Sequence, residues 1–130
     1  MIVVDASALL EFLLRTARGA RLAERLRAPD SSTHVPHLLD LEAAQVLRRY
    51  VRRGEIHSER AWQALDILRD LPLLRYPHDP LLPRIWELRE NLTAYDAAYV
   101  ALAEALDATL LTGDERILRA PGHAARVELV

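Results

Sequence analysis

Two aspartates follow short apolar runs of the kind that form buried strands. Asp5 comes directly after residues 2–4, and Asp114 comes two residues after the run 109–112. Open α/β sheets place their chemistry at the carboxyl ends of such strands. Each aspartate is also a good N-cap for the helix expected after it. Taken singly, either residue is explained by capping alone.

Two further acids lie in predicted helices. Glu42 interrupts the apolar side of a helix expected over 38–53, between Leu39 and Val46. A buried glutamate needs a partner, and an arginine or a metal ion would serve equally well. Asp96 lies three residues after Thr93, where an acid completes a capping box. Asp40 lies off the apolar side and is expected to be solvated.

The four acids become more informative when they are considered together, because the predicted elements allow them to converge on one pocket. Two ionised carboxylates about 4 Å apart repel each other by roughly 4 kcal/mol at a surface-like dielectric. Such a pocket therefore needs protonation or a cation. Carboxylate oxygens without histidine or thiolate suit Mg²⁺ or Mn²⁺. Ions of this kind stabilise charge on a phosphoryl group and activate water, as phosphodiester cleavage requires.

The composition removes several rival chemistries. The chain has 130 residues, a net charge of −2 and no cysteine, and all 17 of its basic residues are arginine. Without lysine or cysteine it cannot use a Walker A loop, a Schiff base, a thiolate nucleophile or a thiolate zinc site. No apolar run approaches the roughly 20 residues of a membrane span. We expect one domain, residues 1–130, with no membrane contact and a cytoplasmic location.

Short apolar strands separated by helices predict an α/β fold, a three-layer α/β/α sandwich with a central parallel sheet. Strands are expected over 2–4, 33–35, 73–76, 109–112 and 127–129. Helices are expected over 8–14, 18–26, 38–53, 80–92, 94–106 and 114–118, with another that Ser58 caps and Pro72 ends. Trp62 and Trp86 lie on the inner sides of their predicted helices, which favours the core or a dimer interface.

Four motifs, in order along nearly the whole chain, resemble the PIN domain and, more narrowly, the VapC-type toxins of toxin–antitoxin pairs. They are Val3-Val4-Asp5-Ala6-Ser7, Leu41-Glu42 through Arg49, Leu92-Thr93-Ala94-Tyr95-Asp96 through Ala103, and Leu110-Leu111-Thr112-Gly113-Asp114. The third motif is the most specific. The resemblance implies a Mg²⁺- or Mn²⁺-dependent endoribonuclease.

The resemblance also assigns roles to residues. Asp5, Glu42, Asp96 and Asp114 fall on the family's acidic quartet, as catalytic residues and metal ligands. Ser7 and Thr112 match small hydroxyl positions that could hold a carboxylate or a bound water in place; local backbone hydrogen bonding is the alternative. The implied partners are an RNA substrate, a small VapB-like antitoxin and a second copy of the chain in a homodimer. A PIN-like protein that binds RNA or its partner without cleaving remains the alternative function.

A cluster of arginines surrounds Tyr50 near the end of the helix that carries Glu42. Its members are Arg48, Arg49, Arg52 and Arg53. Arginines beside an acidic pocket could hold an RNA backbone. Cations are also favourable at any helix C-terminus, so each arginine alone is better explained as part of a solvated helix end, whereas the cluster as a whole favours nucleic-acid binding.

Overall fold

The computed structural model describes residues 1–130 and is built around a five-stranded parallel sheet in the order β3-β2-β1-β4-β5. The strands are β1 (Ile2–Val4), β2 (Thr33–Pro36), β3 (Leu73–Tyr76), β4 (Thr109–Thr112) and β5 (Arg126–Leu129). Every neighbouring pair is parallel. All carboxyl ends therefore meet at one edge, where Asp5 and Asp114 follow β1 and β4.

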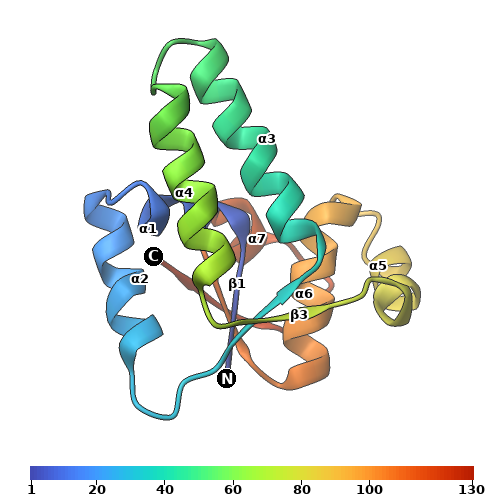
Figure 1. Ribbon diagram of the computed structural model, residues 1–130. Coiled ribbons are helices and arrows are strands. Elements are labelled where there is room, and N and C mark those ends of the chain that lie inside the picture. Colours follow the sequence, from blue (N-terminus) through green and yellow to red (C-terminus); the bar gives the residue numbers. More distant parts are fainter.

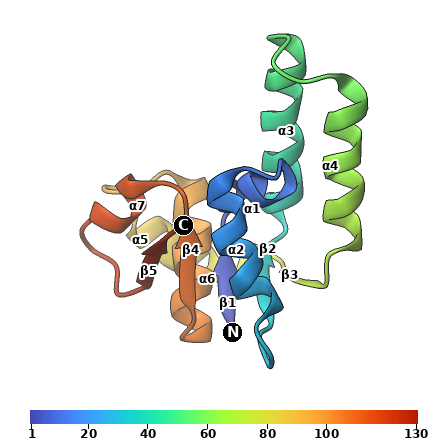
Figure 2. The same ribbon diagram turned by 90° about the vertical axis from the view of Figure 1, so that its left-hand side faces the viewer.

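Helices cover both faces of this sheet, so the predicted three-layer α/β/α sandwich is confirmed (Figure 1). They are α1 (Ala6–Leu13), α2 (Ala17–Arg27), α3 (Leu38–Arg52), α4 (Ser58–Asp70), α5 (Leu82–Glu87), α6 (Ala94–Leu106) and α7 (Glu115–Arg119), with a 3₁₀ turn, η1 (Asp79–Leu81). The hairpin of α3 and α4 extends well beyond the sheet (Figure 2). None of the helices combines the length and apolar content needed to cross a membrane.

Helix α6 is the central helix of the fold. It packs against β1, β2 and β4, and seven consecutive residues, 97–103, are buried. Its predicted bounds, 94–106, are correct at both ends, and Thr93 caps it by accepting a hydrogen bond from the backbone N–H of Asp96 at 3.1 Å. This cap fixes Asp96 in the first turn of the helix.

Two of the expected helix features are wrong, and for a third the structure removes one of two alternatives. His57, not Ser58, occupies the N-cap of α4, and its side chain makes no capping bond. The helix expected over 80–92 is divided into η1 and α5, and α5 ends at Glu87. Trp62 and Trp86 are 58% and 68% exposed, so neither belongs to the core, and the dimer interface stays a prediction for both.

Asp40 is also paired rather than free in solvent. Its carboxylate accepts hydrogen bonds from Nε of Arg75 at 2.8 Å and from Nη2 at 3.0 Å. Arg75 lies in β3, so the pair joins the start of α3 to the edge of the sheet. Sequence spacing gave no sign of this partner, which is 35 residues away.

Candidate active site

The four predicted acids line one cavity of about 450 Å³ at the carboxyl edge of the sheet. Asp5 follows β1, Glu42 lies in α3, Asp96 lies in the first turn of α6, and Asp114 follows β4. Four separate segments thus bring four carboxylates together.

Asp5 is the most buried and the most firmly held of the four. Only 4% of its surface is exposed. Its Oδ1 accepts hydrogen bonds from the Ser7 hydroxyl at 2.7 Å and from the backbone N–H of Ala8 at 2.9 Å, and its Oδ2 accepts one from the Thr112 hydroxyl. Burial raises the pKa of Asp5 although these three bonds oppose the rise. Asp5 therefore caps α1 and also presents a fixed carboxylate to the cavity.

The hydroxyls of Ser7 and Thr112 do more than hold Asp5. Ser7 Oγ accepts the backbone N–H of Gly113 at 2.9 Å, and Thr112 Oγ1 accepts that of Asp114 at 3.0 Å. The Ser7 bond connects the start of α1 to the turn after β4, and the Thr112 bond lies within that turn. Loss of either hydroxyl would remove one of the three hydrogen bonds that hold Asp5 and disturb the backbone that carries Asp114.

Glu42 is supported by a tyrosine rather than by the arginine considered from the sequence. The phenol of Tyr99, whose residue is only 1% exposed, donates a hydrogen bond to Glu42 Oε1 at 2.7 Å. Burial raises the pKa of Glu42, the Tyr99 bond opposes this, and the nearby charges of Asp96 and Asp5 raise it further. Sequence reasoning assigned Tyr99 no role; its one signal was a spacing of three residues from Asp96, which puts both on one side of α6.

Asp96 and Asp114 form the other side of the cavity. Burial raises the pKa of Asp96. The hydrogen bond with the Thr93 hydroxyl opposes this rise, and the charge of Asp114 adds to it. Asp114 behaves differently because Arg116 donates to it from Nη2 to Oδ2 at 2.6 Å and from Nε to Oδ1 at 3.0 Å. These bonds lower the pKa of Asp114. Arg116 was not among the predicted site residues, and no sequence pattern singled it out.

The donor set fits a divalent cation. Three carboxyl groups have raised pKa values because burial and mutual repulsion disfavour their charges, and a cation removes that cost. The acids do not form a preassembled cluster of three or more metal ligands. Mg²⁺ does not require one, because it keeps several waters and binds proteins through one or two carboxylates.

The predicted arginine cluster is divided by the structure. Arg49 lines the cavity together with Tyr50. Arg48, Arg52 and Arg53 are exposed and lie outside its lining. The cluster therefore places one arginine beside the acids, not four.

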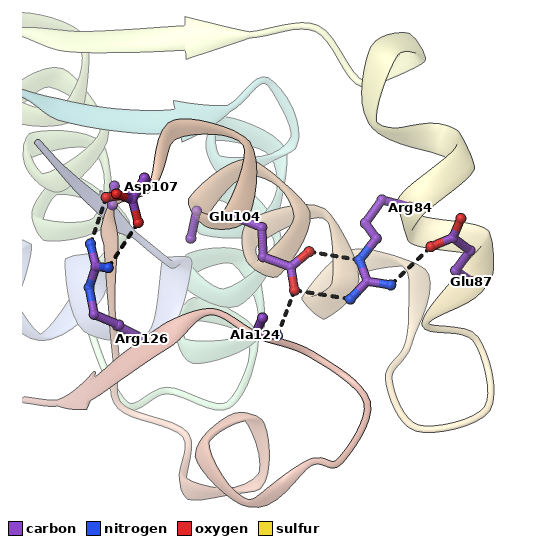
Figure 3. A pocket seen from close by; sticks show the side chains of 8 residues that line it. Arg84, Glu87, Glu104, Asp107, Ala124 and Arg126 are labelled. Carbon is purple, nitrogen blue, oxygen red and sulfur yellow. Dashed lines mark hydrogen bonds and ion pairs between the residues drawn. The ribbon is translucent and has the colours of Figure 1, made fainter.

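A second hollow, of about 430 Å³, lies at the other end of α6 (Figure 3). Arg84 donates to both carboxylate oxygens of Glu104, at 2.7 and 3.0 Å, and to Glu87 at 2.9 Å. Arg126 is paired with Asp107 at 2.8 Å. Each of these charged side chains is already paired with another, so none is left unpaired for a ligand. The pairs instead hold α5, α6 and the segment before β5 together.

Comparison with known proteins agrees with this geometry. The family model of the PIN domain matches residues 2–123. Ribonuclease VapC1 of Mycobacterium tuberculosis is 47% identical over 129 residues, which cover 98% of this chain and 96% of that protein. The crystal structure of PAE2754 from Pyrobaculum aerophilum has a TM-score of 0.71 at 26% identity, covering 97% of this chain and 81% of that chain. A toxin–antitoxin complex from Klebsiella pneumoniae contains the same fold, with a TM-score of 0.66 at 17% identity over 92% and 91% of the two chains. The chain therefore belongs to the PIN-domain family, among its VapC members.

Proposed function

We propose that this chain is a Mg²⁺- or Mn²⁺-dependent endoribonuclease and the toxin of a toxin–antitoxin pair. The observation that carries the proposal is the convergence of four carboxylates, three with raised pKa values, on one cavity. VapC1 supports the reaction class because it is named a ribonuclease and is similar over nearly its whole length.

The residues of the site have two kinds of role, holding the cation and orienting the carboxylates. The divalent cation would be held by the four acids, Asp5, Glu42, Asp96 and Asp114. When bound, it would neutralise negative charge on the phosphodiester. Ser7 and Thr112 keep the Asp5 carboxylate in one orientation, because each donates to a different oxygen. Tyr99 does the same for Glu42.

A small antitoxin of the VapB type is the proposed protein partner. The Klebsiella complex shows a protein of this fold within a toxin–antitoxin assembly, and the VapC relatives place this chain on the toxin side. Blocking the acidic cavity is the direct way to silence such an enzyme, since all four acids open onto it.

The test combines RNA cleavage with cation binding. Purified protein should cleave RNA with Mg²⁺ or Mn²⁺, and a chelator should stop it. Loss of a residue that only supports a metal ligand can reduce activity by roughly 100-fold. Asp96→Asn removes a proposed ligand itself, so it should reduce the cleavage rate by at least as much. It should also weaken Mn²⁺ binding in calorimetry. Asp70→Asn, at an exposed position at the end of α4, is the matched control and should change neither.

Two results would overturn the proposal. If cleavage persisted in Asp96→Asn or in the presence of a chelator, the acids would not be responsible for the reaction. Binding of Mn²⁺ and RNA with no turnover, across a varied RNA pool, would instead establish the non-cleaving alternative.

A further inference from the structure

Beyond the four acids the cavity continues between α1 and α3, and its lining changes from polar to mostly apolar. This part lies next to Glu42, which shares a face of α3 with residues four and seven positions later. We call it the α1–α3 recess; it is lined by Leu10, Glu11, Leu14, Val46, Arg49 and Tyr50.

The recess has a definite order along α3. Glu42, Val46 and Arg49 follow one another on the same face, so the lining passes from acidic to apolar to cationic. At 1.5 Å per residue, Arg49 lies about 10 Å along the helix axis from Glu42. A group bound in the recess would therefore adjoin whatever the acids hold.

The charges at the recess indicate what can enter it. Glu11 faces the recess and accepts a hydrogen bond from the Thr16 hydroxyl. Its negative charge disfavours a phosphate inside, whereas the leucine and valine side chains and the Tyr50 ring favour a neutral planar group. Arg49, which is exposed and takes part in none of the ion pairs of the chain, remains free for an anion at the mouth.

We propose that the α1–α3 recess binds the base of an unpaired nucleotide beside the scissile phosphate, with Tyr50 packing against the base and Arg49 contacting the neighbouring phosphate. The inference rests on the proposed ribonuclease function and assigns Tyr50 and Arg49 as residues that position its substrate. Unstacked bases of single-stranded or looped RNA stack on aromatic side chains. A base that remains stacked in a duplex cannot turn into the recess.

The test compares Tyr50→Leu with Tyr50→Phe. Leucine keeps apolar volume without a ring, and phenylalanine keeps the ring. With a short single-stranded RNA, Tyr50→Leu should raise KM by about 10-fold, with a much smaller change in kcat, and Tyr50→Phe should behave as wild type. Arg49→Ala should raise KM and reduce the salt slope of binding by about one. Arg69→Ala, an exposed arginine on α4, is the control.

A binding measurement separates this proposal from the proposed function. In an Asp96→Asn background, fluorescence anisotropy should show weaker RNA binding when Tyr50→Leu is added. If the wild-type protein cleaves nothing, the function fails while this comparison still tests the recess. Unchanged KM and affinity in Tyr50→Leu, or duplex cleaved as fast as single strands, would overturn the recess proposal. It would also be overturned if Tyr50→Leu weakened only antitoxin binding, which would make the recess a protein-docking site.

Discussion

Replacing Tyr99 with phenylalanine tests how the protein supports a carboxylate inside its core. The change removes a single oxygen atom, and the ring that packs in α6 stays. Glu42 then loses the one side-chain hydrogen bond it accepts, at Oε1. Burial and the neighbouring acids, which raise the pKa of Glu42, remain in force.

The expected cost follows from the type of bond. A hydrogen bond to a charged group contributes about 1.5–3 kcal/mol to stability, and no cavity term adds to it because the ring is kept. A chain of 130 residues unfolds with an entropy of about 270 cal/mol/K. Where Glu42 is ionised, Tyr99→Phe should therefore lower Tm by about 5–11 °C in metal-free buffer.

The pH dependence gives the prediction its sign. The Tyr99 bond is stronger to the charged carboxylate, so the pKa of Glu42 should be higher in Tyr99→Phe than in the wild type. The stability difference is therefore full above both of the pKa values that Glu42 has in the two proteins. It shrinks as the pH falls through the pKa values that Glu42 has in the two proteins.

Thermal unfolding in chelator at neutral and acidic pH measures this difference, and carboxyl NMR titration reads the pKa of Glu42 directly. Tyr95→Phe is the matched control, since Tyr95 lies one turn earlier in α6 and is 65% exposed. Equal stability of Tyr99→Phe and Tyr95→Phe, or a Glu42 pKa that does not rise, would refute the reasoning.

Other changes test the surroundings of the site. Arg84→Ala should destabilise the protein by about 2 kcal/mol at pH 7; because Arg84 lowers the pKa of Glu104, the deficit should fade in urea unfolding as the pH drops below the ordinary glutamate pKa. Arg116→Ala frees the Asp114 carboxylate, so calorimetry should show several-fold tighter Mn²⁺ binding. Equal or weaker binding would contradict the idea that the Arg116 guanidinium competes with the cation for Asp114. Gly19→Ala should cost about 3 kcal/mol or more, since a Cβ there would lie 2.2 Å from a backbone carbonyl oxygen of α1; a thermal melt near wild type would contradict that close approach.

The parts of the fold that the sequence predicted well carry their own local signals. Helix α6 has a capping threonine at its start and a continuous apolar interior, and its bounds are correct. Strand β4 is a short apolar run, and its bounds are also correct. These features depend on neighbours in the chain, so no knowledge of packing is needed to find them.

The sequence could not decide what covers a surface. Helical periodicity placed Trp62 and Trp86 on the apolar sides of their helices, but it cannot say whether another element lies there. In the structure both side chains face outward. Asp40 differs from its prediction for the converse reason, because its partner Arg75 comes from a strand that only the tertiary fold brings close.

The candidate site divides in the same way. Asp5 and Asp114 were predictable as neighbours because parallel strands end at one edge of a sheet. Tyr99 and Arg116 were not, because their importance lies in contacts with acids on other elements or across a turn. The sequence offered an arginine or a metal as the partner of Glu42, and the structure shows a tyrosine hydroxyl instead.

Helix capping and site chemistry are not alternative roles for the aspartates in this fold. Asp5 caps α1 and Asp114 caps α7, while Thr93 caps α6 and so fixes Asp96 in its first turn. A helix that begins at the carboxyl edge of a sheet needs an acceptor at its start, and a carboxylate that meets this need is held at the edge where the cavity opens. Capping therefore accounts for the position of these acids, and burial, which raises the pKa values of Asp5 and Asp96, accounts for the cost of their charges that a bound cation would remove. An acid that satisfies a helix start should not for that reason be removed from a list of candidate metal ligands.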